Sequence, residues 1–451
     1  MKTPIVDFVR SYAAQNGVRL HMPGHKGRAH LGCESLDITE IAGADVLYEA
    51  TGVIGESEQN ATALFGSAHT FYSTEGATLA IKAMLATVKM SLPRGTRLRV
   101  LAARNAHKAF LYAATLLDID VTWLYPSKSA HFCACPIDAD DVAAALLSCK
   151  EKPHAVYLTS PDYLGNVLDI QGIAAKCKAC GVPLLVDNAH GAYLGFLQPS
   201  RHPLALGATM CADSAHKTLP ALTGGAYLHV AKDAPAAYLA SAREALSLFA
   251  STSPSYLILQ SLDLCNAYLE NGYTARLSHI VSCIDGVRAV LRAHGYTVPD
   301  SEPLKIVIKA SDSGYTGEAL AELLRENGIE PEFADREYVV LMCTTDNTEE
   351  ELVQLCSALC SIPLAAPLTS EALPLVRPVA VLPIREAMLA PFTRVPIKAA
   401  LGRICATPAV SCPPAVPVAV AGERIDATVL STLAYYGVES IAVLIDDIDD
   451  Q

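Results

Sequence analysis

Charged residues are scarce in this chain of 451 residues, and the basic ones are in the minority. Asp, Glu, Lys and Arg together make up 18% of the sequence, against about 25% in a typical soluble domain. The 47 acidic residues outnumber the 34 basic ones and give a net charge of −13. Binding to nucleic acid needs a basic surface for the phosphates, so this balance argues against it. A strongly basic membrane-binding surface is excluded on the same ground.

The sequence also lacks the marks of membrane insertion and of secretion. No apolar run approaches the ~18 residues that a membrane-spanning helix needs. Asp7 and Arg10 interrupt the N-terminal stretch, so we do not expect a secretory signal peptide. The 14 cysteines make up about 3% of the chain, far fewer than in a disulfide-stabilised scaffold. We expect a soluble, cytoplasmic protein with reduced thiols and with no membrane or nucleic-acid partner.

Apolar sequence, in contrast, is abundant. Hydrophobic residues make up 51% of the chain, which suffices for a large core and excludes disorder as its main character. Helix and strand patterns alternate along the first half, for example a helix at Thr78–Val88 and a strand at Ala155–Thr159. The strand patterns are short apolar runs, typical of strands covered on both faces. They predict an α/β fold built from right-handed βαβ units around a mainly parallel sheet.

We expect three parts along the chain. Residues 1–50 form an N-terminal segment, in which the Gly- and His-rich stretch His21–Gly27 has no regular structure. Residues 51–295 form the large domain, and residues 296–451 form a smaller α/β domain. The Pro-rich stretch 362–424 is interpreted as an ordered, extended connection within that smaller domain.

A carboxylate directly follows one of the apolar strand patterns. Asp187 begins the run Asp187-Asn188-Ala189-His190-Gly191 after the strand at Pro183–Val186. The carboxyl ends of parallel strands are where open α/β sheets bind their ligands. Asp187 is therefore a candidate ligand-binding residue, although an Asp at this place can equally cap the next turn or helix.

A lysine among small polar residues follows further along, in Ser214-Ala215-His216-Lys217-Thr218. Hydroxyls and an imidazole beside a lysine in an apolar neighbourhood suit a lysine that forms a Schiff base next to a bound phosphate. A single lysine is more often a surface residue of a helix, and the pattern alone leaves that alternative open.

Two weaker signals precede these motifs. Gly76, Ala77 and Thr78 open a helix, and the N–H groups at a helix start bind anions such as phosphate. His107 follows the strand pattern Leu98–Ala102, where its ring can lie flat over a planar cofactor. Each feature also has a structural explanation, namely a helix cap for the first and a hydrogen bond to a backbone carbonyl for His107.

The order of these four features resembles that of the fold-type I pyridoxal-phosphate enzymes. Among them the chain is identified as a member of the Orn/Lys/Arg decarboxylases, in the short form without an N-terminal wing domain. The resemblance spans residues from about 3 to 445, so it covers nearly the whole chain. The strings that carry it are His21-Met22-Pro23-Gly24-His25-Lys26-Gly27, Arg104-Asn105-Ala106-His107-Lys108, Ser160-Pro161-Asp162-Tyr163-Leu164-Gly165, Asp187 to Gly191, Ser214 to Thr218, Arg385-Glu386-Ala387, Gly402-Arg403-Ile404, and Cys412-Pro413-Pro414-Ala415-Val416-Pro417 leading to Gly422-Glu423.

The resemblance implies an aminotransferase-like large domain, a smaller C-terminal domain and pyridoxal 5'-phosphate as cofactor. It implies that Asp187 keeps the pyridine nitrogen of the cofactor protonated and that Lys217 binds the cofactor's aldehyde as an imine. His107 is expected to stack on the ring opposite Ala189. The remaining residues expected to bind the cofactor are Gly76, Ala77, Thr78, His190, Ser214 and His216. Glu75 and Ala77 depart from the residues usual in the family, so we expect phosphate binding to depend mainly on Thr78, Ser214 and His216.

The implied reaction is decarboxylation of a basic amino acid, with release of CO₂ and a polyamine or polyamine precursor. Arginine, lysine and ornithine are all candidate substrates. Arginine is favoured because short-form members of the family are often assigned to it. The distal cation of such a substrate needs a carboxylate. Asp45 and Glu56 are the candidates, and each is equally explained as a cap of a turn or helix. The resemblance also implies a homodimer or larger homo-oligomer whose neighbouring subunit completes each site; no metal is expected.

Parts of the sequence also match other classes of protein or site. An aminotransferase or aldolase of the same fold shares the cofactor residues but not the His21–Gly27 and C-terminal strings. A decarboxylase-like regulator without activity is disfavoured by the presence of Asp187, His107 and Lys217. The Ser-x-x-Lys pattern of acyl enzymes also fits Ser214 to Lys217, but its companion motifs are missing. Cys177 and Cys180 have the spacing of a redox pair or half a zinc site and are interpreted as buried or semi-buried thiols.

Overall fold

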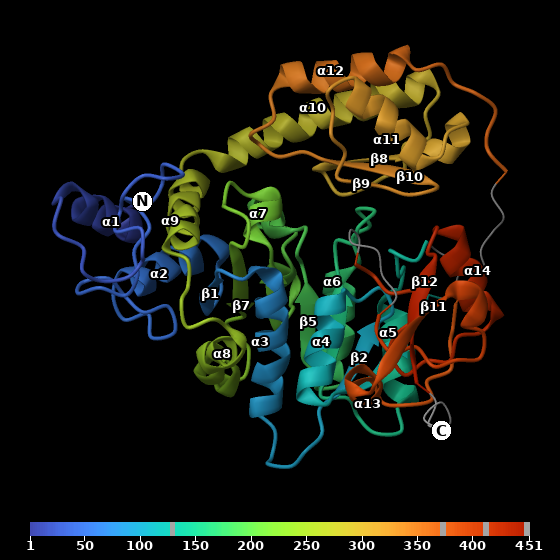
Figure 1. The fold of residues 1–451 in the computed structure, drawn as a ribbon, viewed down its shortest axis with the longest axis horizontal. Coiled ribbons are helices and arrows are strands. Elements are labelled where there is room, and N and C mark those ends of the chain that lie inside the picture. Colours follow the sequence, from blue (N-terminus) through green and yellow to red (C-terminus); the bar gives the residue numbers. More distant parts are fainter. Residues whose placement is uncertain (127–130, 370–375, 409–414, 446–451) are drawn as a thin grey trace. The chain divides into compact units, whose positions relative to one another are not determined.

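The computed structural model in Figure 1 describes residues 1–126, 131–369, 376–408 and 415–445. Of the motif residues, Cys412, Pro413 and Pro414 lie outside the described residues. The chain divides into two compact units, each assembled from several segments. The first unit consists of Met1–Thr96, His154–Ser160 and Ile170–Leu277, and the second of Arg97–Pro153, Pro161–Asp169 and Ser278–Gln451. The division expected at residues 50 and 295 stays a prediction.

Five strands form the centre of the first unit. They are β1 (His69–Ser73), β4 (Ala155–Thr159), β5 (Leu184–Asp187), β6 (Met210–Asp213) and β7 (Ala226–Val230). β4, β5 and β6 run parallel, while β7 is antiparallel to both β6 and β1. In this register Asp187 lies between Thr159 and Ala212. The carboxyl ends of β4, β5 and β6 therefore meet at one edge of the sheet, which is where ligands bind in such folds.

Helices surround these strands, and α3 and α8 pack beside each other (Figure 1). The helices of the first unit are α1 (Pro4–Ala14), α2 (Val53–Phe65), α3 (Gly76–Met90), α6 (Ile170–Ala179), α7 (Ala215–Thr218), α8 (Ala236–Phe249) and α9 (Tyr256–Glu270), with the short 3-10 helices η1 (Ala192–Phe196) and η2 (Pro203–Leu206). α1 begins at a proline, whose fixed φ suits a first helical residue. Its first-turn N–H groups at Ile5 and Val6 are accepted by the buried carboxylate of Asp263 in α9, which replaces a local cap.

The second unit contains the parallel strands β2 (Arg99–Ala103) and β3 (Asp120–Leu124) and two smaller sheets. The smaller sheets are β8-β10-β9 and β11-β12, with β8 (Lys305–Lys309), β9 (Phe333–Ala334), β10 (Tyr338–Met342), β11 (Phe392–Pro396) and β12 (Ser440–Leu444). Its helices are α4 (Lys108–Leu117), α5 (Ala139–Ser148), α11 (Gly317–Glu326), α12 (Glu349–Ser361), α13 (Ile384–Leu389) and α14 (Ala427–Tyr435), with η3 (Ala310–Ser313) and η4 (Ile397–Ala399). α10 (Tyr273–His294) continues from the first unit into the second. α5 and α12 each start with a capping box, formed by Asp138 with Asp141 and by Thr348 with Glu351.

The main sheet has seven strands in the order β1-β7-β6-β5-β4-β2-β3, and it is mostly parallel. This confirms the predicted α/β class and the predicted mainly parallel sheet. The strand predicted at Ala155–Thr159 has the same bounds as β4. No helix was predicted at α2, and no strand was predicted at β1, β6 or β7. Among the described residues, no helix is both long and apolar enough to cross a membrane.

Candidate active site

Asp187 ends β5 with its carboxylate buried in the first unit. The Tyr157 hydroxyl donates to Oδ2 (3.1 Å), and the Ala189 N–H donates to Oδ1 (3.2 Å). Burial raises the pKa of Asp187 to about 6, although the two hydrogen bonds and the charge of Lys217 act in the opposite direction. A carboxylate that is costly to ionise here is well suited to a cationic ring N–H as its partner.

A tight turn follows Asp187 and carries the next two candidate residues, Ala189 and His190. Asn188 N–H donates to the carbonyl of Ala212 (2.9 Å), and Gly191 N–H donates to the carbonyl of Asn188 (2.8 Å). A Cβ at position 191 would lie 2.0 Å from Oδ1 of Asn188. Gly191 is therefore required by the close approach of the Asn188 side chain.

Lys217 lies in the short helix α7, directly after β6. Its Nζ is 2.8 Å from Nε2 of His190, so the lysine and the turn after β5 are in direct contact. The Lys217 charge also acts on the pKa of Asp187. The structure thus brings together Asp187, His190 and Lys217, which come from two separate motifs.

The turn at Gly224 and Gly225 links α7 to the start of α3. The carbonyl of Gly224 accepts the N–H of Gly76 (2.8 Å), and the carbonyl of Gly225 accepts Nδ1–H of His216 (2.9 Å). Burial lowers the pKa of His216, assisted by the charge of Lys217. In its neutral form His216 presents a lone pair at Nε2, so it needs a proton before it can donate to a phosphate oxygen.

The first turn of α3 offers donors for an anion. Gly76 has a φ of +71°, which favours glycine, and the N-cap Glu75 makes no side-chain cap. The Glu75 carboxylate instead accepts the N–H of Ser251 (2.7 Å). Ala77 and Thr78 occupy the following positions of the first turn, where backbone N–H groups point out of a helix.

These residues fit pyridoxal phosphate. The buried carboxylate of Asp187 is a partner for a ring nitrogen, Lys217 supplies an amine, and the start of α3 supplies phosphate donors. Ser214 is the N-cap of α7 without using its hydroxyl as a cap. The buried hydroxyl of Thr218 has no hydrogen-bond partner among the described atoms. A buried hydroxyl without a partner is unusual, because polar groups in such a region are ordinarily paired.

Two candidates of the first unit, Asp45 and Glu56, are not brought into this group, and a third, His107, lies in the other unit. His107 belongs to the second unit, where it is the N-cap of α4 and its Nδ1 accepts the N–H of Ala109 (3.1 Å). Glu56 is exposed in the first turn of α2. Asp45 is buried, and its two oxygens accept N–H groups from Val46, Thr51, Gly52, Ile54 and Gly55. These contacts make Asp45 a cap for the loop and helix that follow it.

Sequence reasoning missed two groups of buried polar residues. Tyr157 supports Asp187 from the neighbouring strand. Asp213, directly before Ser214, accepts hydrogen bonds from His202, His229 and Asn188. The only sequence signal for Asp213 is its place beside the lysine motif, since its histidine partners are set by strand register.

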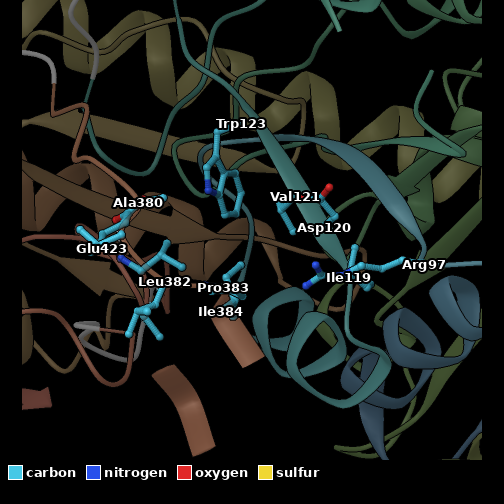
Figure 2. Close-up of a pocket in the computed structure, with 13 residues that line it drawn as sticks. Arg97, Ile119, Asp120, Val121, Trp123, Ala380, Leu382, Pro383, Ile384 and Glu423 are labelled. Atoms are coloured by element: carbon cyan, nitrogen blue, oxygen red, sulfur yellow. Dashed lines mark hydrogen bonds between the residues drawn. The ribbon is translucent and has the colours of Figure 1, made fainter. Parts of the chain in front are cut away.

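In the second unit, a buried ion pair joins two of the family strings. Arg104 donates to Glu423 Oε2 (3.0 Å) and to the carbonyls of Pro417 and Val418. Its guanidinium also lies 5.1 Å from the ring centroid of Trp123. Figure 2 shows Trp123 and Glu423 at a cavity of about 270 Å³, with Pro383 and Ile384 among its other walls. No candidate site residue lines this cavity.

The family model that matches this chain and several of its relatives are named as decarboxylases of basic amino acids. The family model described as Orn/Lys/Arg decarboxylase, major domain, matches residues 3–297. YaaO of Bacillus subtilis, an uncharacterised protein, is 31% identical over 94% of this chain and 92% of its own length. An arginine decarboxylase of Halalkalibacterium halodurans is 28% identical over 96% of this chain and 92% of its own. Lysine decarboxylase LdcA of Pseudomonas aeruginosa is 25% identical over 59% of this chain and 40% of its own.

Solved structures support the fold. The lysine decarboxylase LdcF of Francisella novicida superposes with a TM-score of 0.82 at 18% identity, over 98% of this chain and 81% of that one. The constitutive lysine decarboxylase of Escherichia coli gives 0.77 at 18% identity, over 98% and 82% of the two chains.

Proposed function

Because the chain belongs to the Orn/Lys/Arg decarboxylase family, we propose that it decarboxylates arginine, releasing CO₂ and the corresponding amine. Membership of this family makes the chain a pyridoxal-phosphate-dependent amino-acid decarboxylase, acting within the class of basic amino acids. The choice of arginine is supported by relatives named arginine decarboxylase that align over more than nine-tenths of the chain. The relatives named lysine decarboxylase align over a smaller part of it.

The observation that carries the proposal is the contact between Lys217 and His190 next to buried Asp187. When bound, pyridoxal phosphate supplies a ring that accepts the electron pair left at Cα as the carboxylate departs. Asp187 would hold the proton on the ring nitrogen, because a buried carboxylate is strongly stabilised by a cationic N–H. Lys217 would supply the amine for the cofactor's attachment, with its Nζ held by His190.

The phosphate would be held by groups from two helices. The first-turn N–H groups at Ala77 and Thr78 and the hydroxyls of Thr78 and Ser214 are donors for it. A phosphate dianion near His216 favours protonation of that imidazole, which then donates from Nε2. His107 is assigned to the opposite ring face from Ala189 by the family resemblance.

Substrate recognition and assembly belong to the same proposal. The distal cation of the substrate needs a carboxylate, and Glu56 is exposed whereas the oxygens of Asp45 are already engaged by backbone donors. Glu56 is therefore the better of the two candidates. By the family resemblance, the enzyme acts in the cytoplasm as a homodimer or larger homo-oligomer.

The test is product analysis with the purified holoenzyme. Arginine, lysine and ornithine are supplied separately, and CO₂ and the amine product are measured over time. We expect the highest kcat/KM with arginine. A higher kcat/KM with lysine or ornithine contradicts the substrate assignment, and an absence of CO₂ with all three contradicts the reaction.

A further inference from the structure

A group of buried polar side chains lies behind the candidate site in the first unit. Asp213, His202 and His229 are at most 2% exposed, and none of them belongs to the cofactor set. Nε2 of His202 lies 2.9 Å from Oδ2 of Asp213, and Nε2 of His229 lies 3.2 Å from the same oxygen. One carboxylate oxygen thus accepts hydrogen bonds from two imidazoles, and all three side chains are buried.

Strand register explains how residues so far apart in sequence meet here. β6 and β7 are antiparallel, so His229 lies beside Cys211, two residues before Asp213 on β6. β1 is antiparallel to β7 and sets Thr70 beside His229, where the Thr70 hydroxyl is 2.8 Å from Nδ1. His202 arrives separately, as the N-cap of η2.

The protonation of the group follows from its partners. A carboxylate only accepts, so both imidazoles donate from Nε2 to Oδ2. Burial by itself would raise the pKa of Asp213, but the two imidazoles outweigh it and the pKa lies below its usual range. Burial lowers the pKa of His229, despite the opposing effect of Asp213. At neutral pH the group therefore holds an ionised Asp213 and a neutral His229.

The other oxygen of Asp213 faces the active-site turn. Nδ2 of Asn188 donates to Oδ1 of Asp213 over 2.8 Å, and Oδ1 of Asn188 rests against Gly191. Asn188 is next to Asp187 and two residues before His190. Asp213 is itself next to Ser214 and four residues before Lys217. One carboxylate is therefore linked to the turn that carries His190 and to the helix that carries Lys217.

We propose that Asp213 is a positioning residue, which, through Asn188, fixes the turn from Asp187 to His190 against Lys217. The imidazoles of His202 and His229 fix the orientation of its carboxylate, so that Oδ1 remains directed at Asn188. The inference rests on the proposed function for its effect on turnover, but the linkage exists in the cofactor-free protein. Small displacements of reacting groups lower the rate of a reaction by large factors, so a residue that fixes their positions increases turnover.

A metal centre is the alternative explanation of the same residues. The ligating atoms of His202, Cys211, Asp213 and His229 all lie within 4.8 Å of one another. However, Nδ1 of His202 accepts the N–H of Leu204 (3.4 Å), which leaves the ring proton on Nε2. A metal at Nε2 would need the proton on Nδ1 instead. The hydrogen bonds therefore favour the carboxylate-centred arrangement.

The experiment uses three disruptive single variants, and the two at histidines each have a matched conservative variant. His229→Leu and His202→Leu remove a donor to Asp213, whereas His229→Gln and His202→Gln retain an N–H. Asn188→Ala breaks the link to the turn. In cofactor-loaded enzyme we expect each of the three disruptive variants to lower kcat by about 10- to 100-fold with little change in KM. The Gln variants should recover most of this loss.

Asn266→Ala is the structural control. Asn266 is a buried asparagine of the same unit that donates to the Tyr72 hydroxyl and to Ser57, outside the site. It should lower thermal stability without lowering kcat per loaded site. If Asn188→Ala and both Leu variants keep wild-type kcat, or if Gln rescues neither histidine, the positioning role is wrong.

A second readout uses the apoenzyme and is independent of turnover. Imidazole N–H groups bound to a buried carboxylate give downfield proton NMR signals, and we expect two such signals that Asp213→Asn removes. Their absence in the wild type, or one tightly bound metal ion per chain that Asp213→Asn loses, would overturn the proposal. If the wild type decarboxylates nothing while both signals are present, the proposed function fails and the linkage stands.

Discussion

Nζ of Lys217 lies 2.8 Å from Nε2 of His190, across the gap between the helix after β6 and the turn after β5. The two residues are 27 positions apart, and each belongs to a motif that was singled out separately. Their contact joins the lysine motif to the aspartate motif. An apolar side chain at position 190 would remove this partner of the half-buried Lys217.

The first prediction concerns the attachment of the cofactor. Borohydride reduction of the holoenzyme followed by peptide mapping should find the pyridoxyl group on Lys217. Lys217→Ala should abolish that label and lower turnover by at least about 10³-fold, because the amine acts covalently. Lys232→Ala, at an exposed position, serves as the control and should leave the label unchanged. A label on another lysine would contradict the assignment.

The second prediction concerns pH and the cofactor-free protein. The pKa of Asp187 is raised to about 6 in the folded chain, against about 4 in an unfolded one. The folded state therefore binds the Asp187 proton more tightly than the unfolded state does. This contribution to the free energy of unfolding is fully present below about pH 4 and is lost as the pH rises through 6. Asp187→Asn cannot ionise, so between pH 4 and pH 8 it should gain up to about 3 kcal/mol over wild type.

Urea unfolding of the apoenzymes at several pH values measures this difference. Asp233→Asn, at an exposed position, is the control and should show little change. A constant difference between wild type and Asp187→Asn across this range would mean that Asp187 does not titrate as described. In the holoenzyme the same variant should keep the cofactor but lose about 10²- to 10³-fold in kcat, by analogy with other lost charge-stabilising groups.

The third prediction concerns the buried pair of Arg104 and Glu423. Arg104→Met leaves the Glu423 carboxylate buried without its cation, which should cost about 3–5 kcal/mol of unfolding free energy. The double variant Arg104→Met/Glu423→Leu should lose less than the single one, since no charge is left behind. Circular dichroism during urea unfolding provides the measurement.

A matched control for that pair lies at the surface of the same unit. Arg97 pairs with Asp118, and both side chains are nearly half exposed. Arg97→Met should therefore cost no more than about 1 kcal/mol. Equal losses for Arg97→Met and Arg104→Met would show that burial does not govern the strength of the Arg104 pair.

The fourth prediction separates the two acids proposed for the distal cation. Glu56→Gln should raise KM for arginine about tenfold or more, with stability unchanged, because Glu56 is exposed and a lost charge pair weakens binding. Asp45→Ala should instead lower stability by about 1–2 kcal/mol, as expected for a lost cap. An unchanged KM for Glu56→Gln would move the distal pocket to another acid.

The sequence was most informative where local chemistry determines structure. The motifs at Asp187 and Lys217 were found because a strand end and a short polar helix leave local patterns. No helix was predicted at α2, which contains Gly55, a residue that is unfavourable in a helix interior. In the fold, a Cβ at position 55 would lie 2.2 Å from the carbonyl oxygen of Ala50, so glycine is required by tertiary packing.

The role of Asp213 was beyond sequence reasoning for a different reason. Its partners come from η2, from the antiparallel strand β7 and from the turn after β5. The register that aligns Cys211 with His229 depends on the whole sheet and leaves no periodic signal in either strand. Likewise, the five backbone N–H groups around Asp45 become visible only once the loop is folded.

The position of Trp123 makes the second unit optically distinct. It is the single tryptophan of the chain, and its ring lies against Arg104 in that unit. Intrinsic tryptophan fluorescence therefore reports the melting of this unit, whereas far-ultraviolet circular dichroism reports both. Superimposable unfolding curves would show that the two units melt cooperatively, while displaced midpoints would reveal a partly folded species in which one unit persists.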